Sequence, residues 1–377
     1  MTTSSSFTRE YQKLNKNQKI AVDSIDGPVM VMAGPGTGKT QVLTLRIANI
    51  LKKTDTPPSS ILALTFTDAA SNEMRQRLVN LIGQPAYSVQ ISTFHSFCQS
   101  VILANPDLFI VAEETEHLQD LDRTKILQKI INSHQFKYLK PLNAPFYYVS
   151  SIIENIRILK REGVSPEEFK KTLTNPPDKN LDLHKIYSLY QQELLKQGKF
   201  DFEDMINWVV DKFEKDPDLL LSYQERLSYF LVDEYQDTNS AQNQLVFKLA
   251  SYWGKKANLF AVLDPNQSIF RFQGASLENT KEFIARFPST TIINLNQNYR
   301  STQTILDSAR SVIKNNTPKA ISLKSNLSGL DKLINTVHFT QSIFEDYFIA
   351  KDIKNLISKG AKPENMAIIV RHNKDLD

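Results

Sequence analysis

The chain has 377 residues, of which 41% are hydrophobic and 23% are charged, and its formal net charge is +4. A chain of this length exceeds one hydrophobic core of ordinary size, so we expect two or three packed units. Its apolar runs fall short of the roughly 18 to 20 residues that span a bilayer, and its N-terminal segment MTTSSSFTREYQ is polar. These features argue against a membrane protein and a secretory signal, and they predict a cytoplasmic location.

Cys98 is the only cysteine, which excludes an intramolecular disulfide, a cysteine-ligated iron–sulfur cluster and a cysteine zinc site. The six histidines are scattered, with no pair at i, i+4, so we expect no histidine metal site. The small positive charge permits a nucleic-acid partner without requiring one.

Short apolar strands alternate with helical patterns along much of the chain, which is typical of an α/β fold with a parallel sheet. The predicted strands occupy residues 27–34, 60–66, 87–93, 227–234, 258–264 and 290–295. Between the first three strands, the spacing predicts helices over residues 38–51 and 68–82.

The pattern changes to helical between residues 105 and 198, where no convincing strand occurs. Apolar residues at helical spacing occupy 123–134, 149–162 and 184–198. We interpret 105–198 as a helical insertion domain, so that the α/β domain comprises 1–104 and 199–316.

After a predicted helix at 301–316, the chain continues as strand, helix and strand at 333–339, 343–360 and 365–371. One βαβ unit cannot form a stable sheet alone. We therefore interpret residues 317–377 as the incomplete start of a second α/β domain.

The segment AGPGTGKT (33–40) fits the phosphate-binding loop except at its first position, where alanine replaces glycine. It lies between a predicted strand and a predicted helix, as the mechanism requires. Glycines let backbone N–H groups converge on phosphate oxygens at the helix N-terminus. The expected nucleotide contacts are Ala33, Gly34, Pro35, Gly36, Thr37, Gly38 and Lys39, with Lys39 on the β- and γ-phosphates and Thr40 on Mg²⁺.

A second motif, FLVDEYQDTN (230–239), places two adjacent carboxylates at the end of a predicted strand. Beside a phosphate loop, one acid can hold Mg²⁺ while its neighbour orients and deprotonates an attacking water. We assign the metal role to Asp233 and the base role to Glu234.

Further motifs follow one order along the chain: LNKNQKIAV (14–22), LALTFTDAASNEMRQRL (62–78), STFHSFC (92–98), FDFEDMI (200–206), VLDPNQSIFRFQGA (262–275) and LNQNYRS (295–301). With the phosphate loop and the acidic pair, this series resembles the N-terminal half of a superfamily 1 DNA helicase of the UvrD/Rep/PcrA group. The resemblance covers almost the whole chain. It implies a RecA-like P-loop sheet with a helical insertion domain and the start of a second RecA-like domain.

The resemblance also implies an activity: ATP hydrolysis coupled to 3′–5′ movement on single-stranded DNA, with unwinding at duplex junctions. By this resemblance Gln18 reads the adenine edge, which its donor and acceptor amide suits. Tyr299 stacks on the purine, and Arg300 contacts the γ-phosphate. Gln267 links the γ-phosphate to the DNA-binding surface.

Single-stranded DNA requires aromatic faces and phosphate contacts. The resemblance assigns base stacking to Phe66, Phe270 and Phe272. It assigns contacts with the DNA backbone to Thr65, Thr67, Thr93, His95 and Arg271.

Four positions depart from the family pattern. Gln41 stands where an arginine near the nucleotide is usual, so we expect a weaker grip on the nucleotide. Leu263, Phe272 and Gln273 stand where glycine, tryptophan and arginine are common. Loss of the last arginine removes a contact with DNA or with the second domain.

The family's motifs V and VI are expected beyond residue 377, in a second domain or partner chain that completes the ATPase cleft. We therefore expect this chain to bind ATP–Mg²⁺ and to bind DNA weakly, but to hydrolyse and unwind poorly by itself. An alternative is a nucleotide-gated DNA-binding module that catalyses nothing alone. A small-molecule phosphotransferase is disfavoured by the motif that contains Gln18 and by the aromatic pair Phe270 and Phe272.

Overall fold

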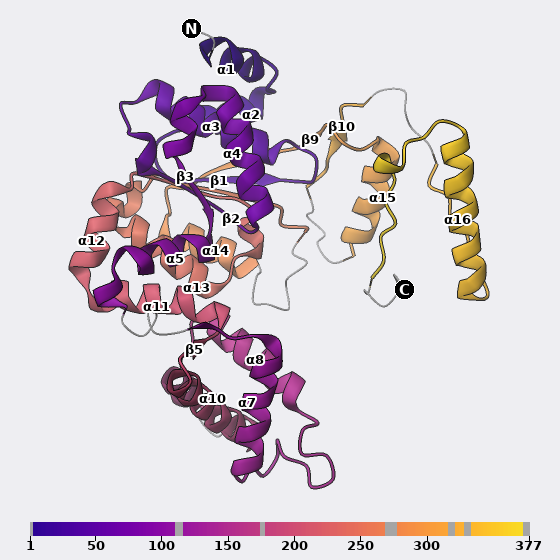
Figure 1. Ribbon diagram of the computed structural model, residues 1–377. Coiled ribbons are helices and arrows are strands. Elements are labelled where there is room, and N and C mark those ends of the chain that lie inside the picture. The colour runs from indigo at the N-terminus through magenta and orange to yellow at the C-terminus, as the bar shows by residue number, and fades with distance from the viewer. Residues whose placement is uncertain are drawn as a thin grey trace. The chain divides into compact units, whose positions relative to one another are not determined.

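The computed structural model describes residues 3–109, 116–173, 178–267, 277–315, 321–327 and 333–371. The chain divides into two compact units, Met1–Leu330 and Asp331–Asp377 (Figure 1). The sequence places a second domain from residue 317, whereas the structure begins its second unit after Leu330. The reason is that β10 (Lys324–Ser325) pairs with β9 (Gln297–Asn298) and so belongs to the first unit. None of the described helices is long and apolar enough to cross a membrane.

A six-stranded parallel sheet forms the centre of the first unit, in the order β3-β2-β6-β7-β1-β8. The strands are β1 (Val29–Ala33), β2 (Ile61–Thr65), β3 (Gln90–Thr93), β6 (Tyr229–Val232), β7 (Leu259–Leu263) and β8 (Thr291–Leu295). All six predicted strands are confirmed. Because the strands are parallel, the loops that follow them emerge at one edge of the sheet.

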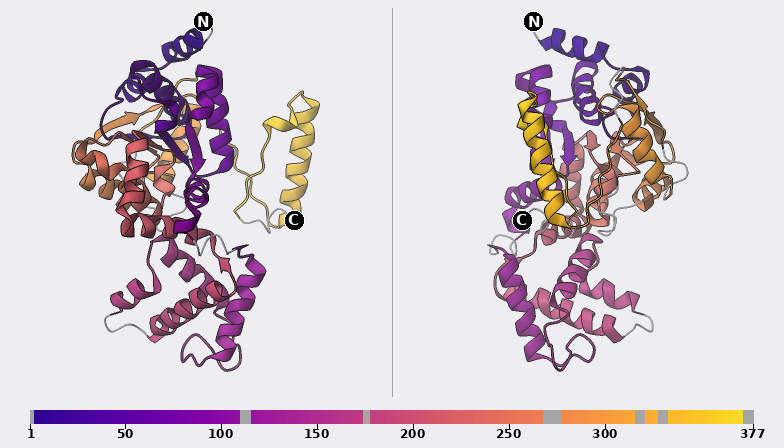
Figure 2. Two further views of the ribbon diagram at one scale, coloured as in Figure 1. Left: turned by 60° about the vertical axis from the view of Figure 1, so that its left-hand side comes forward. Right: turned by 90° about the vertical axis from the view of Figure 1, so that its right-hand side faces the viewer.

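Helices cover both faces of this sheet (Figures 1 and 2). Strand residues alternate between the two cores: Val29 and Val31 pack on one face, and Met30 packs on the other. The first face carries α1 (Thr3–Gln12), α2 (Lys16–Asp23), α3 (Lys39–Lys53) and α4 (Asp68–Ile82). The opposite face carries α5 (Phe94–Ala104), α11 (Phe202–Lys215), α12 (Pro217–Arg226), α13 (Ser240–Ala250) and α14 (Leu277–Arg286).

The segment between α5 and α11 contains a separate apolar core. Its helices are α7 (Asp120–Ser133), α8 (Val149–Arg161), α9 (Pro166–Thr172) and α10 (Asp178–Lys196). The expectation of no strand here is wrong at one place, since β4 (Glu116–His117) pairs with β5 (Lys199–Phe200). Two-residue strands are too short to leave a periodic signal. Their ladder joins the two ends of the insertion.

The C-terminal part of the chain that the structure describes contains two of the predicted helices but neither of the predicted strands. The helices α15 (Gln303–Ile313) and α16 (Ser342–Ser358) are confirmed. The predicted strands at 333–339 and 365–371 are wrong, because neither segment pairs with another described segment and a strand requires a neighbour for its ladder hydrogen bonds. Short 3₁₀ turns occur at Pro58–Ser60, Gln84–Ser88, Pro106–Leu108, Tyr235–Asp237, Ser251–Lys256 and Pro363–Asn365.

Candidate functional site

The loop between β1 and α3 requires glycine at two positions. Gly36 and Gly38 have φ values of 68° and 85°, in the region that only glycine adopts readily. There is also no space for a side chain at either position. A Cβ at Gly36 would lie 2.6 Å from Arg300 Cβ, and a Cβ at Gly38 would lie 2.8 Å from Gln18 Nε2. Any side chain at these positions would therefore distort the loop.

Hydrogen bonds within the protein engage the carbonyl oxygens of Gly34, Pro35, Gly36 and Thr37. The four bonds run from Thr37 Oγ1 to Gly34 O (2.7 Å), from Asn298 Nδ2 to Pro35 O (2.5 Å), from Tyr299 N to Gly36 O (2.8 Å) and from Gln18 Nε2 to Thr37 O (2.9 Å). In the described part of the chain, the N–H groups of Gly36, Thr37 and Gly38 bond no protein acceptor. These donors lie at the start of α3, which is the arrangement that binds phosphate.

The acidic pair follows β6 and faces this loop. Lys39 Nζ lies 2.6 Å from Glu234 Oε2, which also accepts a hydrogen bond of 2.8 Å from Gln236 Nε2. Among the described residues, Glu234 is the only non-glycine with positive φ, at 47°. Such a conformation is costly for a side chain with a Cβ and persists where surrounding contacts fix it. The structure thus holds the predicted base against the predicted phosphate-binding lysine.

Asp233 is 7% exposed, and its backbone N–H donates to Leu64 O at 2.9 Å. Burial, with the charge of Glu234 second, raises the pKa of the Asp233 carboxyl to about 6, although Lys39 opposes the shift. A buried carboxylate beside a second carboxylate would be stabilised by a divalent cation. The residue type and its burial therefore fit Mg²⁺.

The other predicted nucleotide contacts surround the loop. Tyr299 is 37% exposed, and its hydroxyl accepts from Asn15 Nδ2 and donates to Gln297 Oε1, both at 2.9 Å. Gln18 is buried and uses its amide inside the protein, since Oε1 accepts from Asn15 N at 3.0 Å while Nε2 bonds the loop. The contact of Gln18 with adenine stays a prediction. It would use the remaining lone pair of Oε1 and the remaining proton of Nε2, because the first of each already bonds the protein. Gln267 is exposed, and its linking role also stays a prediction.

Comparisons with known proteins agree with this geometry. The model for the UvrD/REP helicase N-terminal domain matches residues 14–288, and that for the UvrD-like helicase C-terminal domain matches residues 293–377. The chain belongs to the UvrD/Rep helicase family. It is 35% identical over 366 residues to the ATP-dependent DNA helicase PcrA of Staphylococcus aureus (strain Mu50), covering 96% of this chain and 48% of that protein. It is 36% identical over 364 residues to the PcrA helicase of Bacillus subtilis (strain 168), covering 96% of this chain and 47% of that protein.

The chain therefore spans about half the length of the curated relatives it matches. The family assignment made from the motifs is confirmed. So is the α/β class with its parallel sheet.

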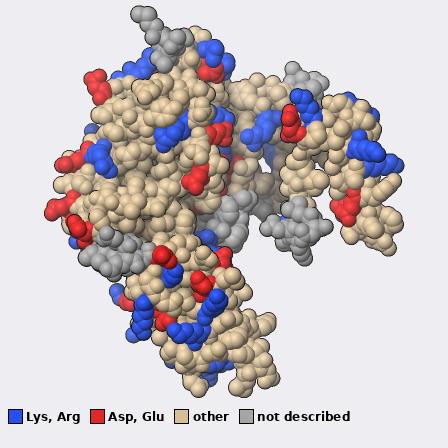
Figure 3. Space-filling model, in the orientation of Figure 1, with Lys and Arg blue, Asp and Glu red and all other residues tan. Residues whose placement is uncertain are grey.

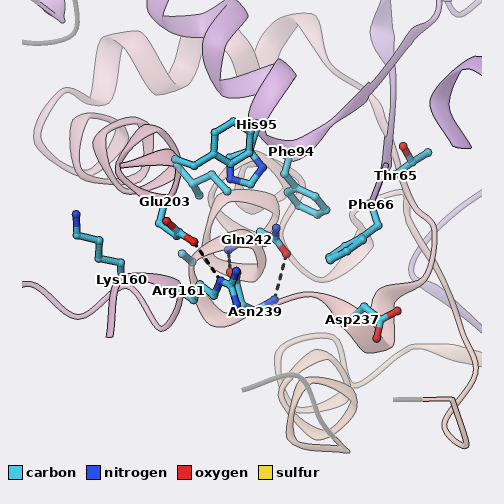
Figure 4. A pocket seen from close by; sticks show the side chains of 13 residues that line it. Thr65, Phe66, Phe94, His95, Lys160, Arg161, Glu203, Asp237, Asn239 and Gln242 are labelled. Atoms are coloured by element: carbon cyan, nitrogen blue, oxygen red, sulfur yellow. Dashed lines mark hydrogen bonds and ion pairs between the residues drawn. The ribbon is translucent and has the colours of Figure 1, made fainter. Parts of the chain in front are cut away.

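A cavity of about 240 Å³ in this UvrD/Rep family member lies at the ends of β2 and β3. Figure 4 shows Phe66, Phe94 and His95 along one side of it, with Arg161 and Asn239 opposite. The His95 and Phe202 rings stack with centroids 3.9 Å apart. The pocket thus brings together three of the predicted DNA contacts, Thr65, Phe66 and His95, with an arginine from α8.

The three threonines predicted to contact DNA use their hydroxyls inside the protein. Thr65 Oγ1 lies 2.5 Å from Ser71 Oγ and is buried. Thr67 caps α4 and Thr93 caps α5, each accepting an N–H from the first turn at 3.1 Å. Contact with DNA stays a prediction for all three. The predicted contacts Phe270, Arg271 and Phe272 lie outside the described residues.

Charge on the visible surface is mixed. On the face of the first unit shown in Figure 3, Lys and Arg are interspersed with Asp and Glu instead of forming one continuous basic surface. Electrostatic attraction over this face is therefore a weak argument for a nucleic-acid partner. The pocket and the family carry that argument instead.

Three residues of the site were missed by the sequence analysis. Asn298 donates a hydrogen bond to the phosphate loop, and Gln236 donates one to the predicted base Glu234. The ring of Phe202 contacts the ring of His95. All three lie inside quoted motifs, LNQNYRS, DEYQDTN and FDFEDMI, which is the signal that could have found them. Their roles depend on partners distant in the chain, so the motif letters alone did not reveal them.

His95 predicts a measurable acid sensitivity. Burial, with the charge of Arg161 second, lowers the pKa of His95 to about 4, and its Nε2 has no partner in the described residues. In the unfolded state His95 becomes protonated near pH 6.5, whereas in the folded state it becomes protonated only near pH 4. The free energy of unfolding therefore falls as the pH drops from about 6.5 to about 4. We expect His95→Gln to remove about 2 kcal/mol of the stability lost between about pH 7 and about pH 5.

Urea unfolding at the two pH values measures this difference. His338→Gln, at an exposed position, is the matched control and should leave the pH dependence unchanged. If wild type and His95→Gln lost the same free energy of unfolding between the two pH values, protonation of His95 would not be the cause of the acid sensitivity.

Proposed function

We propose that this chain is the ATP-binding portion of a DNA-dependent ATPase and helicase that moves 3′ to 5′ on single-stranded DNA and unwinds duplex junctions. The observation that carries the proposal is the ion pair of 2.6 Å between Lys39 and Glu234, beside a loop in which the N–H groups of residues 36–38 bond no protein acceptor among the described residues. The names of the PcrA relatives support the same activity.

ATP binding would begin with an exchange of partners. Lys39 leaves Glu234 and turns its ammonium toward the β- and γ-phosphates, where the loop N–H groups also donate. Glu234 is then free to accept a proton from the attacking water, while Gln236 continues to orient its carboxylate. Arg300 places its guanidinium against the charge that develops on the γ-phosphate.

Thr40 and Asp233 are the residues that would hold Mg²⁺. When bound, Mg²⁺ neutralises phosphate charge during the displacement. The elevated pKa of Asp233 fits this role, because a carboxylate that is costly to bury alone gains most from a cation. Phe66 and His95 would contact single-stranded DNA at the pocket.

The test is ATP hydrolysis by the 377-residue chain with and without single-stranded DNA, beside nucleotide binding followed by fluorescence. Turnover that rises with DNA supports the proposed activity and overturns the expectation that this chain hydrolyses ATP poorly by itself. Nucleotide and DNA binding without turnover supports the alternative, a nucleotide-gated module that works with a partner. Absence of both turnover and nucleotide binding would overturn both.

A further inference from the structure

Asn298 is fully buried at the end of β9 and bonds two functional segments at once. Its Nδ2 donates to Pro35 O at 2.5 Å, and its Oδ1 accepts from the N–H groups of Arg300 (2.8 Å) and Ser301 (2.7 Å). Two backbone donors meet Oδ1, which identifies that atom as the oxygen, so the orientation of the amide is unambiguous. One side chain therefore spans the phosphate loop and the segment that carries Arg300.

The sheet order explains how these segments meet. β1 pairs with β8 in parallel, with Ala33 opposite Leu295, so the chains that follow the two strands leave the sheet side by side. The backbone of Asn298 is also fixed, because its carbonyl oxygen accepts a hydrogen bond of 2.7 Å from Asn326 N beside the β9–β10 ladder. The bridging amide is thus fixed at both its backbone and its side chain.

Gly36 permits the close approach. A Cβ at this position would lie 2.8 Å from Asn298 Nδ2 and 2.6 Å from Arg300 Cβ. The Tyr299 N–H donates to Gly36 O at 2.8 Å in the same gap. A side chain at residue 36 would therefore push the loop away from the segment 298–301.

We infer that Asn298 is a positioning residue that locks the phosphate loop and Arg300 into one unit, so that both meet the nucleotide's phosphates in a fixed register. This inference rests on the proposed ATP site. Asn298 acts through the two segments it joins, because its amide atoms are directed to Pro35, Arg300 and Ser301.

Two substitutions separate the two halves of this bridge. Asn298→Asp keeps an oxygen for the N–H groups of Arg300 and Ser301 but offers Pro35 no donor. We expect it to raise KM for ATP about tenfold with kcat within about twofold of wild type, since the loop loses its bond to residue 298 and meets a buried negative charge, while the segment of Arg300 keeps its acceptor. Asn298→Ala removes both halves and should also lower kcat about tenfold, because Arg300 loses its register.

Hydrogen exchange gives a readout that does not need turnover. Exchange at the Tyr299 N–H, which donates to Gly36 O, should accelerate in both variants, whereas exchange at residues 300 and 301 should accelerate only in Asn298→Ala. Asn296→Asp, the same change at an exposed neighbour, is the matched control. Thermal unfolding is recorded for each variant, and if Asn298→Asp does not fold, Asn298→Ala decides the question.

Wild-type KM and wild-type exchange at the Tyr299 N–H in Asn298→Asp would overturn the inference, as would an equal loss in both variants that tracks thermal stability. If the wild-type chain binds a fluorescent ATP analogue without hydrolysing it, the proposed catalysis fails separately. The exchange pattern and the analogue's affinity still decide the role of Asn298.

Discussion

Glu234→Gln is expected to lower the rate of ATP hydrolysis by about 10²- to 10⁴-fold while nucleotide binding persists. Glutamine has nearly the same shape and can still meet Gln236, but its amide cannot take a proton from water. It also cannot form the 2.6 Å ion pair with Lys39. Lys39 therefore no longer needs to leave a carboxylate before it meets phosphate, and the affinity for nucleotide should hold or increase.

The rate is measured with saturating ATP and DNA, and binding is measured by fluorescence titration. Glu225→Gln makes the same chemical change at an exposed position on α12 and should hydrolyse ATP as the wild type does. If Glu234→Gln kept more than about a tenth of the wild-type rate, Glu234 would not be the general base.

The second large effect concerns stability, at the base of the insertion. Lys160 is 1% exposed, and its Nζ lies 2.6 Å from Asp201 Oδ2 and 2.9 Å from the Asp204 carboxylate. Asp201 also accepts from Arg123 at 3.1 Å and from the Tyr190 hydroxyl at 3.0 Å. This buried cluster joins α7, α8 and α10 to the start of α11.

We expect Lys160→Met to lower the free energy of unfolding by about 3 to 5 kcal/mol, because it leaves buried carboxylates without their cation. Burial acts to lower the pKa of Lys160, but the carboxylates of Asp204 and Asp201 outweigh it, and the net direction is upward. The lysine is thus charged in the folded protein, and the pair is an ionic one.

Urea denaturation measures the loss. Lys129→Met, which breaks an exposed pair with Glu193, is the matched control and should cost about 0 to 1 kcal/mol. Adding Asp204→Asn to Lys160→Met should restore part of the stability, since one uncompensated charge is removed. If Lys160→Met lost no more than Lys129→Met, the buried cluster would not be what fixes the insertion.

This cluster also bears on the pocket. Phe202, which stacks on His95, lies one residue from Asp201, and Glu203 pairs with Arg161 at 3.3 Å. The side chains that line one end of the cavity are therefore placed by the same charges that anchor α8. Loosening the insertion should disturb the pocket before it disturbs the sheet.

The sequence predicted the sheet well because four of its six strands, β1, β2, β6 and β7, are buried on both faces. Runs such as FLVDE and LFAVL are apolar and β-branched enough to mark strands without knowledge of their partners. The two-residue strands β4 and β5 carry no such pattern. The segments 333–339 and 365–371 do carry it, yet neither pairs with any part of the chain that the structure describes. Apolar pattern therefore predicts the capacity to form a strand, and a neighbouring strand decides whether one forms.

The same division holds within the site. The positions of Lys39, Asp233 and Glu234 followed from a glycine-rich turn and from two carboxylates at a strand end. Thr67 and Thr93 show the limit, since a threonine before a helix can cap the helix or contact a ligand with the same atom. The sequence does not say which acceptor or donor lies nearest.

By itself, then, the sequence determined the local elements of this protein: which runs form strands, where glycine must allow positive φ, and which side chains carry charge. Only the tertiary structure decided which of them meet. Asn298 and Pro35 are 263 positions apart in the chain, and they bond because β8 lies beside β1 in the sheet. Local patterning depends on the chemistry of neighbouring residues, whereas hydrogen-bond partners depend on strand order, which no short segment encodes.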